Sequence, residues 1–186
     1  MCDTLSVYVD PRLQSLCKRT MPDIHFIADE KALNSEDCDF HLPIQSLGGL
    51  IRNDISDFDR TVRGYLKADP VRVEAIRKEL KLKNKTVIGI SWKSFKTKYK
   101  TKSVRLKDME CIFSGLDVVL VNLQYGDVED EIREFKEATG IDVLQCTSVD
   151  NREDLDGLAA LIEACDLVVS ITNVTVHLAG ALAKET

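Results

Sequence analysis

The sequence lacks the short signatures that identify many common enzyme classes. It contains no Walker phosphate loop, no GxGxxG dinucleotide fingerprint, no serine, histidine and aspartate set typical of a hydrolase, and no paired metal ligands. Its six cysteines are widely spaced and form no CxxC pair. We therefore expect no metal and no cofactor, and the sequence alone assigns no catalytic residue.

Long apolar runs are also absent. No run approaches the roughly 18 apolar residues of a membrane-spanning helix, and the N-terminus, MCDTLSVYVD, lacks the basic and apolar regions of a signal peptide. These absences predict a cytoplasmic protein without a membrane span. Cys17 and Cys165 fall on apolar helix faces, so we expect them to be buried free thiols. The net charge of −6 argues against general binding of nucleic acid.

The second half of the chain alternates between strand and helix patterns. Short apolar runs predict strands at 86–92, 117–123, 141–144 and 166–171, and amphipathic patterns predict helices at about 106–114, 128–139, 153–164 and 174–184. This order is typical of an α/β domain, with a Rossmann-like, doubly wound parallel sheet over residues 86–186.

The first sixty residues contain fewer elements. The pattern predicts strands at 5–9 and 24–27, a helix opened by Pro11, a possible third strand at 38–42 and a weak helix at 46–51. Two or three strands are too few to bury both faces of a sheet. We therefore interpret residues 1–64 as the carboxyl-terminal part of an incomplete first domain, followed at 65–85 by a linker and a connecting helix.

Cations gather after the first strand of the second half. Seven lysines and arginines lie between residues 93 and 107, with no acid among them. Lys93 directly follows the strand and is the best candidate to contact an anion, whereas the outer lysines could form a solvated loop. The nearby aromatic residues Trp92, Phe95 and Tyr99 could instead indicate single-stranded nucleic acid, which the acidic remainder of the chain disfavours.

The turns after the predicted strands 86–92, 117–123 and 166–171 should meet at the carboxyl ends of the parallel strands. After 166–171, Thr172 or Asn173 can cap a helix whose first amides could bind an anion, and His177 lies one turn further on. Residues 123–127 could contact a nucleobase or be only a turn, and the acids of 150–156 fit a helix start. From the residues alone, the prediction is an α/β domain with an anion or nucleotide crevice.

Several blocks resemble a known family. They are residues 65–70 (YLKADP), 87–93 (VIGISWK), 123–127 (LQYGD), 154–162 (DLDGLAALI) and 170–182 (SITNVTVHLAGAL). In this order they look like heptosyltransferases of glycosyltransferase family 9, and most of all like the glycosyltransferase-like domain that follows tetratricopeptide repeats in many bacterial proteins. The resemblance implies a GT-B type carboxyl-terminal domain, truncated at its end and preceded by the tail of the amino-terminal domain.

The resemblance also implies roles for individual residues. Those near the diphosphate or sugar of a nucleotide-sugar donor would be Ser91, Lys93, Thr172, Asn173, Thr175 and His177. Those near the nucleoside would be Gln124, Tyr125, Gly126, Glu153 and Asp154. The heptosyltransferases commonly have Asp-Thr where this chain has Thr172-Asn173, so the donor sugar and its base stay open.

The resemblance finally implies a reaction. A glycosyl group would pass from a nucleotide-diphosphate sugar to a hydroxyl of a glycan or protein acceptor, with the catalytic base outside this chain. We therefore expect a fragment of a glycosyltransferase, with a partial donor site and little activity by itself. The alternatives are a non-catalytic nucleotide- or partner-binding α/β scaffold domain, and a nucleic-acid-binding module built on residues 92–107.

Overall fold

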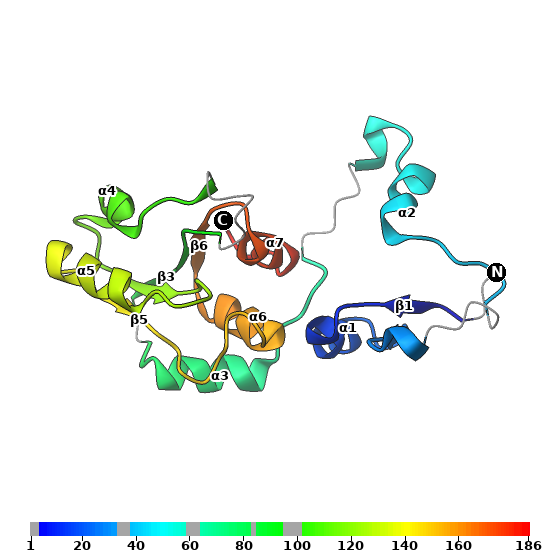
Figure 1. Ribbon diagram of the computed structural model, residues 1–186, viewed down its shortest axis with the longest axis horizontal. Coiled ribbons are helices and arrows are strands. Elements are labelled where there is room, and N and C mark those ends of the chain that lie inside the picture. The colour runs from blue at the N-terminus through cyan, green and yellow to red at the C-terminus, as the bar shows by residue number, and fades with distance from the viewer. Residues whose placement is uncertain (1–3, 33–37, 59–63, 83–84, 95–101) are drawn as a thin grey trace. The chain divides into compact units, whose positions relative to one another are not determined.

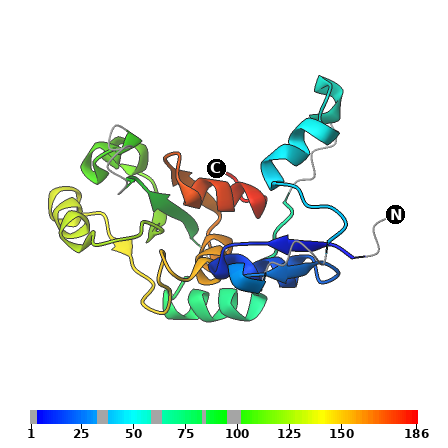
Figure 2. The same cartoon turned by 45° about the vertical axis from the view of Figure 1, so that its right-hand side comes forward.

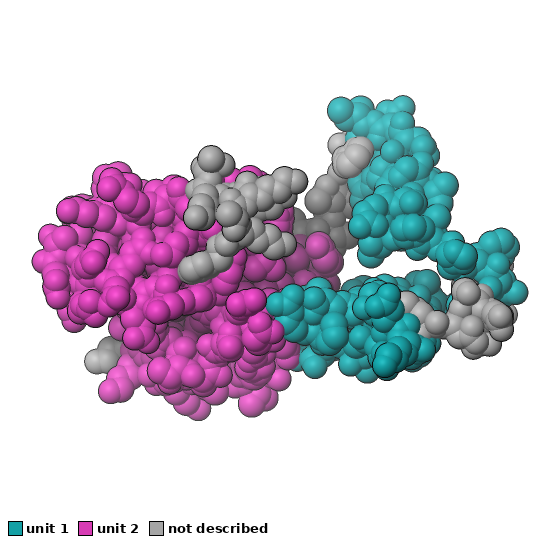
Figure 3. Space-filling view, in the orientation of Figure 1, with its two compact units in different colours: residues 1–63 teal, residues 64–186 magenta. Residues whose placement is uncertain are grey.

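The computed structural model describes residues 4–32, 38–58, 64–82, 85–94 and 102–186. The chain divides into two compact units, residues 1–63 and residues 64–186, which Figure 3 distinguishes by colour. Among the described residues, no helix combines the length and the apolar character needed to cross a lipid bilayer.

The first unit contains a two-stranded parallel sheet. β1 (Ser6–Tyr8) pairs with β2 (His25–Ile27), and the connection runs through the 3₁₀ turn η1 (Pro11–Leu13) and helix α1 (Gln14–Thr20). The predicted strands at 5–9 and 24–27 are thus confirmed in shorter form. Among the described residues of this unit, the buried hydrophobic ones are Leu16, Cys17 and Phe26, so its core is small.

The rest of this unit buries little. Helix α2 (Ile44–Ile51) has no buried residue, and its Ile44 and Leu50 are 67% and 64% exposed. The short turns η2 (Glu30–Ala32) and η4 (Ile55–Phe58) flank it along the chain. The predicted third strand at 38–42 is wrong, because these residues are exposed, form no regular structure and have no neighbouring strand to bond.

The second unit is built on a four-stranded sheet (Figure 1). Its order is β5 (Val143–Leu144), β4 (Val118–Asn122), β3 (Thr86–Ser91) and β6 (Leu167–Ser170), and every pair is parallel. The predicted parallel α/β sheet is confirmed. The chain moves outward from β3 to β4 and β5 and then returns to the other side of β3, so β3 and β6 flank a topological switch point.

Alternation along the strands separates two apolar faces. Ile88, Ile90 and Leu120 point toward one face, where they pack with Phe113 and Phe135. The helices there are η6 (Leu106–Met109), α4 (Glu110–Phe113) and α5 (Glu129–Thr139). Figures 1 and 2 show α3 (Pro70–Glu79) and α6 (Leu155–Ala164) side by side away from them, and α7 (Val174–Ala181) follows β6.

Helix α3, predicted as the connecting helix of the segment 65–85, belongs to the second unit and packs against α6. Asp69 caps it, because its carboxylate accepts from the amide of Val71 at 2.9 Å. At its other end the Glu79 carboxylate accepts from the amide and the hydroxyl of Thr147, at 2.7 and 2.9 Å. Glu79 therefore ties α3 to the loop that follows β5.

This contact predicts a stability effect that depends on pH. Hydrogen bonds from Ser148 and Thr147 hold the pKa of Glu79 at about 2, against the burial that opposes ionisation. The stabilisation is therefore present above the usual glutamate pKa and is lost as the pH falls toward 2. We expect Glu79→Gln to lower the free energy of unfolding by about 1 kcal/mol at pH 7.

Urea denaturation at several pH values measures this effect. The difference between wild type and Glu79→Gln should shrink as the pH is lowered from 5 toward 2. Glu74→Gln is the matched control, because Glu74 lies on the same helix and makes only an exposed ion pair with Lys78. If the difference in free energy of unfolding between wild type and Glu79→Gln stays constant over this pH range, the proposed contact is contradicted.

Candidate functional site

The carboxyl ends of three parallel strands are joined by one chain of hydrogen bonds. Ser91, the last residue of β3, donates from Oγ to Gln124 Oε1 at 3.0 Å, in the turn after β4. Asn173, in the turn after β6, donates from Nδ2 to Ser91 Oγ at 2.8 Å. Three predicted site residues from separate parts of the sequence thus meet at the topological switch point.

The turn after β6 leads directly into α7. Asn173 is the N-cap, as one of the two predicted candidates, and its Oδ1 accepts from the Thr175 amide at 3.0 Å and from Ser170 Oγ at 3.1 Å. Thr175 is fully buried, and its Oγ1 has no hydrogen-bond partner among the described residues. Thr172 and His177 are exposed. The amides of a first helical turn have no acceptor within the helix, so an external acceptor could bind at this end of α7.

Lys93 lies at the edge of this site, but its charge is already partnered. Its ammonium pairs with Glu131 on α5, and both side chains are about three-quarters buried. The same carboxylate accepts from the Leu106 amide at 3.1 Å. Burial opposes ionisation of Glu131, but the hydrogen bonds from Lys93 and Leu106 outweigh it and keep its pKa below the usual value. A diphosphate would have to compete with Glu131 for Lys93.

The structure describes only part of the cationic segment. Lys96, Lys98 and Lys100 lie outside the described residues, as do Phe95 and Tyr99. Arg105 pairs with Asp108 at 2.7 Å. Trp92 is fully buried in the core, so it offers no face on which a base could stack. The described residues therefore do not support a nucleic-acid surface here.

Hydrogen bonds to its backbone oxygens hold the turn after β4 in place. The backbone oxygen of Tyr125 accepts from Gln124 Nε2 at 3.0 Å, and Gly126 has a φ of 84°, which favours glycine. Asn151 donates from Nδ2 to the backbone oxygens of Asn122 and Gln124, both at 3.2 Å. Asn151 was not a predicted site residue, since a lone asparagine in a helix-start segment gives no signal of this contact.

Glu153 and Asp154 are not part of the hydrogen-bonded strand ends. Glu153 is exposed and pairs with its neighbour Arg152 at 3.2 Å. Asp154 caps α6 through the Gly157 amide at 2.8 Å and forms an ion pair with Arg72 of α3. Burial opposes its ionisation, but the bonds from Arg72 and Gly157 outweigh it and lower its pKa. The alternative interpretation of these acids, as helix-start residues, fits their contacts.

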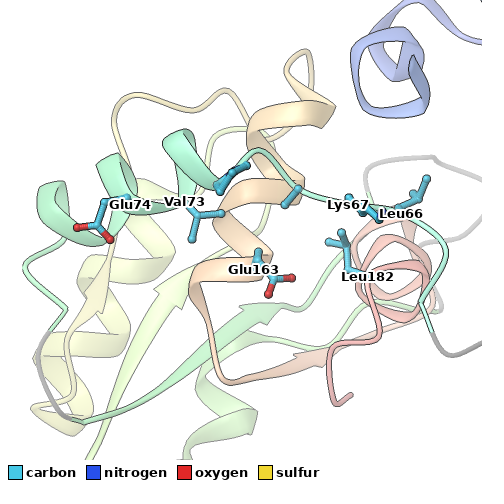
Figure 4. A pocket seen from close by; sticks show the side chains of 8 residues that line it. Leu66, Lys67, Val73, Glu74, Glu163 and Leu182 are labelled. Atoms are coloured by element: carbon cyan, nitrogen blue, oxygen red, sulfur yellow. The ribbon is translucent and has the colours of Figure 1, made fainter. Parts of the chain in front are cut away.

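The structure also has an open hollow away from these turns (Figure 4). Its volume is about 430 Å³, and its walls come from the segment before α3, from α3 and α6 and from Leu182. Glu163, one of the lining residues, pairs with Lys184 at 3.5 Å. None of the predicted site residues lines this hollow. Among the described residues, no three histidine, cysteine, aspartate or glutamate side chains group as metal ligands.

Comparison with known proteins supports the fold. No protein-family model matches the chain. The chain is similar to protein FlbA of Caulobacter vibrioides, with 32% identity over an alignment 198 positions long that covers 96% of this chain and 32% of FlbA. It therefore spans about a third of the length of that relative.

Among solved structures, the chain resembles the ADP-heptose lipopolysaccharide heptosyltransferase II of E. coli. The TM-score is 0.52 at 14% sequence identity, over 72% of this chain and 42% of the other. At this identity the likeness concerns the fold alone. The chain thus has an α/β fold with parallel sheets, of the kind found in a Rossmann-like glycosyltransferase.

Proposed function

We propose that this chain is part of a glycosyltransferase that binds the nucleotide diphosphate of a sugar donor and passes the sugar to an acceptor hydroxyl. One observation carries the proposal: the turns after β3, β4 and β6 meet through Ser91, Gln124 and Asn173 at the switch point of a parallel sheet. In such sheets, ligands bind outside the carboxyl ends of the strands at this point. The fold likeness to a heptosyltransferase agrees with it.

The proposed ligand contacts follow from what remains accessible. The first turn of α7 offers amides and the positive end of the helix dipole to a diphosphate, with Thr172 and His177 beside it. Lys93 would add a cation if it left Glu131. We place the nucleoside beside Tyr125 and Gly126, at the turn after β4.

The reaction we propose is a direct displacement. The acceptor hydroxyl loses its proton to a base and attacks the anomeric carbon of the donor, while the bond from that carbon to the phosphate oxygen breaks. The electron pair stays on the phosphate, whose added charge the α7 amides and Lys93 would stabilise. We propose that the base lies outside this chain.

We also propose that residues 1–63 correspond to the end of the amino-terminal domain of a GT-B type enzyme. The supporting observation is the apolar surface of α2 (Ile44–Ile51), which buries nothing within its own unit. The link to tetratricopeptide repeats and the cytoplasmic location stay predictions.

A second candidate is a scaffold domain that keeps the fold without catalysis. It is favoured by the ion pairs that already satisfy the candidate charges, Lys93 with Glu131 and Asp154 with Arg72. Under this alternative the strand-end network would serve stability only, and no nucleotide would bind.

Thermal unfolding with nucleotides separates the two candidates. ADP, GDP, UDP, CDP and their sugar conjugates would be added singly to wild type and to His177→Ala and Lys93→Ala. A ligand at about ten times its Kd should stabilise the protein by about 1.4 kcal/mol, or roughly 3–6 °C. We expect each substitution to reduce this shift, because each removes a polar group beside the proposed diphosphate.

Lys107→Ala is the matched control, because Lys107 is exposed and its loss changes the net charge as much as Lys93→Ala does. Lys107→Ala should keep the full rise in unfolding temperature on ligand binding. If no nucleotide stabilises a folded wild-type protein, the donor site is wrong and the scaffold alternative stands.

A further inference from the structure

The side-chain oxygen of Gln124 has no capacity left for a ligand. Its side chain is 2% exposed, and Oε1 accepts from Ser91 Oγ at 3.0 Å and from the amides of Trp92 and Lys93 at 3.0 and 2.9 Å. Its Nε2 donates to the Tyr125 backbone oxygen at 3.0 Å. An amide oxygen has two lone pairs, so three donors saturate it. A nucleoside could bond this oxygen only by displacing an internal partner.

The backbone of Gln124 is held as firmly as its side chain. Its amide donates to Asn122 Oδ1 at 2.8 Å, and its carbonyl accepts from Asn151 at 3.2 Å. Asn122 is itself 6% exposed. The side-chain oxygen of Gln124 is therefore fixed in space relative to β4, which makes it a rigid anchor for whatever bonds to it.

Two of its donors are consecutive backbone amides, and this determines the course of the chain after β3. The amides of Trp92 and Lys93 both turn inward toward Oε1. The third donor, Ser91 Oγ, also accepts a hydrogen bond from Asn173 Nδ2 at 2.8 Å. Asn173 in turn caps α7, because its Oδ1 accepts from the Thr175 amide. The buried side chain of Gln124 thus fixes the position of the Lys93 backbone after β3. Through Ser91 and Asn173 it also fixes the position of the first turn of α7.

We propose that Gln124 is a positioning residue of the strand-end site, and not a nucleoside contact. It would act on the ligand only through Lys93 and the N-terminus of α7, which is an inference that rests on the proposed function. The neutral charge of Gln124 is part of this role. A glutamate has nearly the same shape and accepts the same three bonds, but it loses the donor to the Tyr125 backbone oxygen and places a negative charge beside a site for an anion.

The inference needs two substitutions with different consequences. Gln124→Met has a similar volume and removes the acceptor, so the amides of Trp92 and Lys93 lose their partner. Gln124→Glu keeps the acceptor and adds a charge. Gln45→Glu is the control, because Gln45 is an exposed residue of α2 and the substitution makes the same change in net charge.

Two measurements are made on the full chain. Amide hydrogen exchange, without ligand, follows Trp92 and Lys93, and calorimetric titration with inorganic pyrophosphate gives Kd. In Gln124→Met both amides should exchange at least tenfold faster, and Kd should rise at least tenfold. In Gln124→Glu the exchange should stay within about twofold of wild type while Kd rises at least tenfold. Gln45→Glu should change neither.

Unchanged exchange in Gln124→Met would overturn the positioning role, as would a Kd that stays at the wild-type value. Should Gln124→Met fail to fold, Gln124→Glu decides alone: retained protection of both amides supports the role, and loss of it contradicts the role. The exchange measurement needs no ligand. A wild-type protein that binds no pyrophosphate therefore rejects the proposed donor site, while the exchange result still tests the anchor itself.

Discussion

Gly89→Ala is expected to lower the free energy of unfolding by about 1–3 kcal/mol, the range typical of overpacked cores. Gly89 lies in the middle of β3, between β4 and β6. An added Cβ would overlap the Leu123 side chain and lie 3.1 Å from Cys165 Sγ. Both neighbours are buried, so they have little room to move.

Urea denaturation followed by fluorescence measures this loss, because the only tryptophan, Trp92, is buried in the same unit. Gly180→Ala is the control: Gly180 lies in α7, and an added Cβ there would meet nothing within 4 Å. It should raise stability by about 0.5–1 kcal/mol, since alanine favours helix. Equal effects of the two substitutions would contradict the close packing around β3.

The second large effect is expected at the ion pair between α3 and α6. Arg72→Met and Asp154→Asn should each lower the free energy of unfolding by about 1–3 kcal/mol, between the values of exposed and buried pairs. Asparagine keeps the N-cap of α6, so the loss reports on the pair itself. Because the two groups contact each other, the double variant should lose less than the sum of the singles.

Lys78 and Glu74 provide the matched control on the same helix. They form an exposed i, i+4 pair at 3.4 Å, with side chains 74% and 61% exposed. Their double-mutant cycle should give only about 0.3–0.5 kcal/mol. A coupling energy of this small size for Arg72 and Asp154 would mean that Asp154 is not held by α3, and would make it available again for a ligand.

The sheet could be predicted because its signals are local. Short apolar runs such as 86–92 mark strands buried on both faces, as β3 is, and the helix patterns between the strands require parallel pairing. The helix beginning at Pro70 was evident from its Asp69 cap. The buried free thiols of Cys17 and Cys165 are likewise confirmed. These features depend on each residue and its near neighbours in sequence.

The partners of the site residues could not be predicted in the same way. Arg72 and Asp154 are 82 positions apart, and Lys93 and Glu131 are 38 apart. Nothing in the sequence around Glu131 indicates a partner, but α5 places its side chain against Lys93 and the Leu106 amide. The acids of 150–156 predict a helix start without fixing its cap, which the structure places at Asp154. Such contacts depend on how the elements pack, which no local pattern records.

An NMR titration with nucleoside diphosphates (ADP, GDP, UDP and CDP, each added singly) tests the shared strand-end site most directly. The amide signals of Lys93, Tyr125 and Val174 report separately on the turns after β3, β4 and β6. If these turns form one anion site, the three signals shift together and fit a single Kd. Shifts confined to one turn, or three different constants, would contradict a shared site and with it the proposed donor pocket.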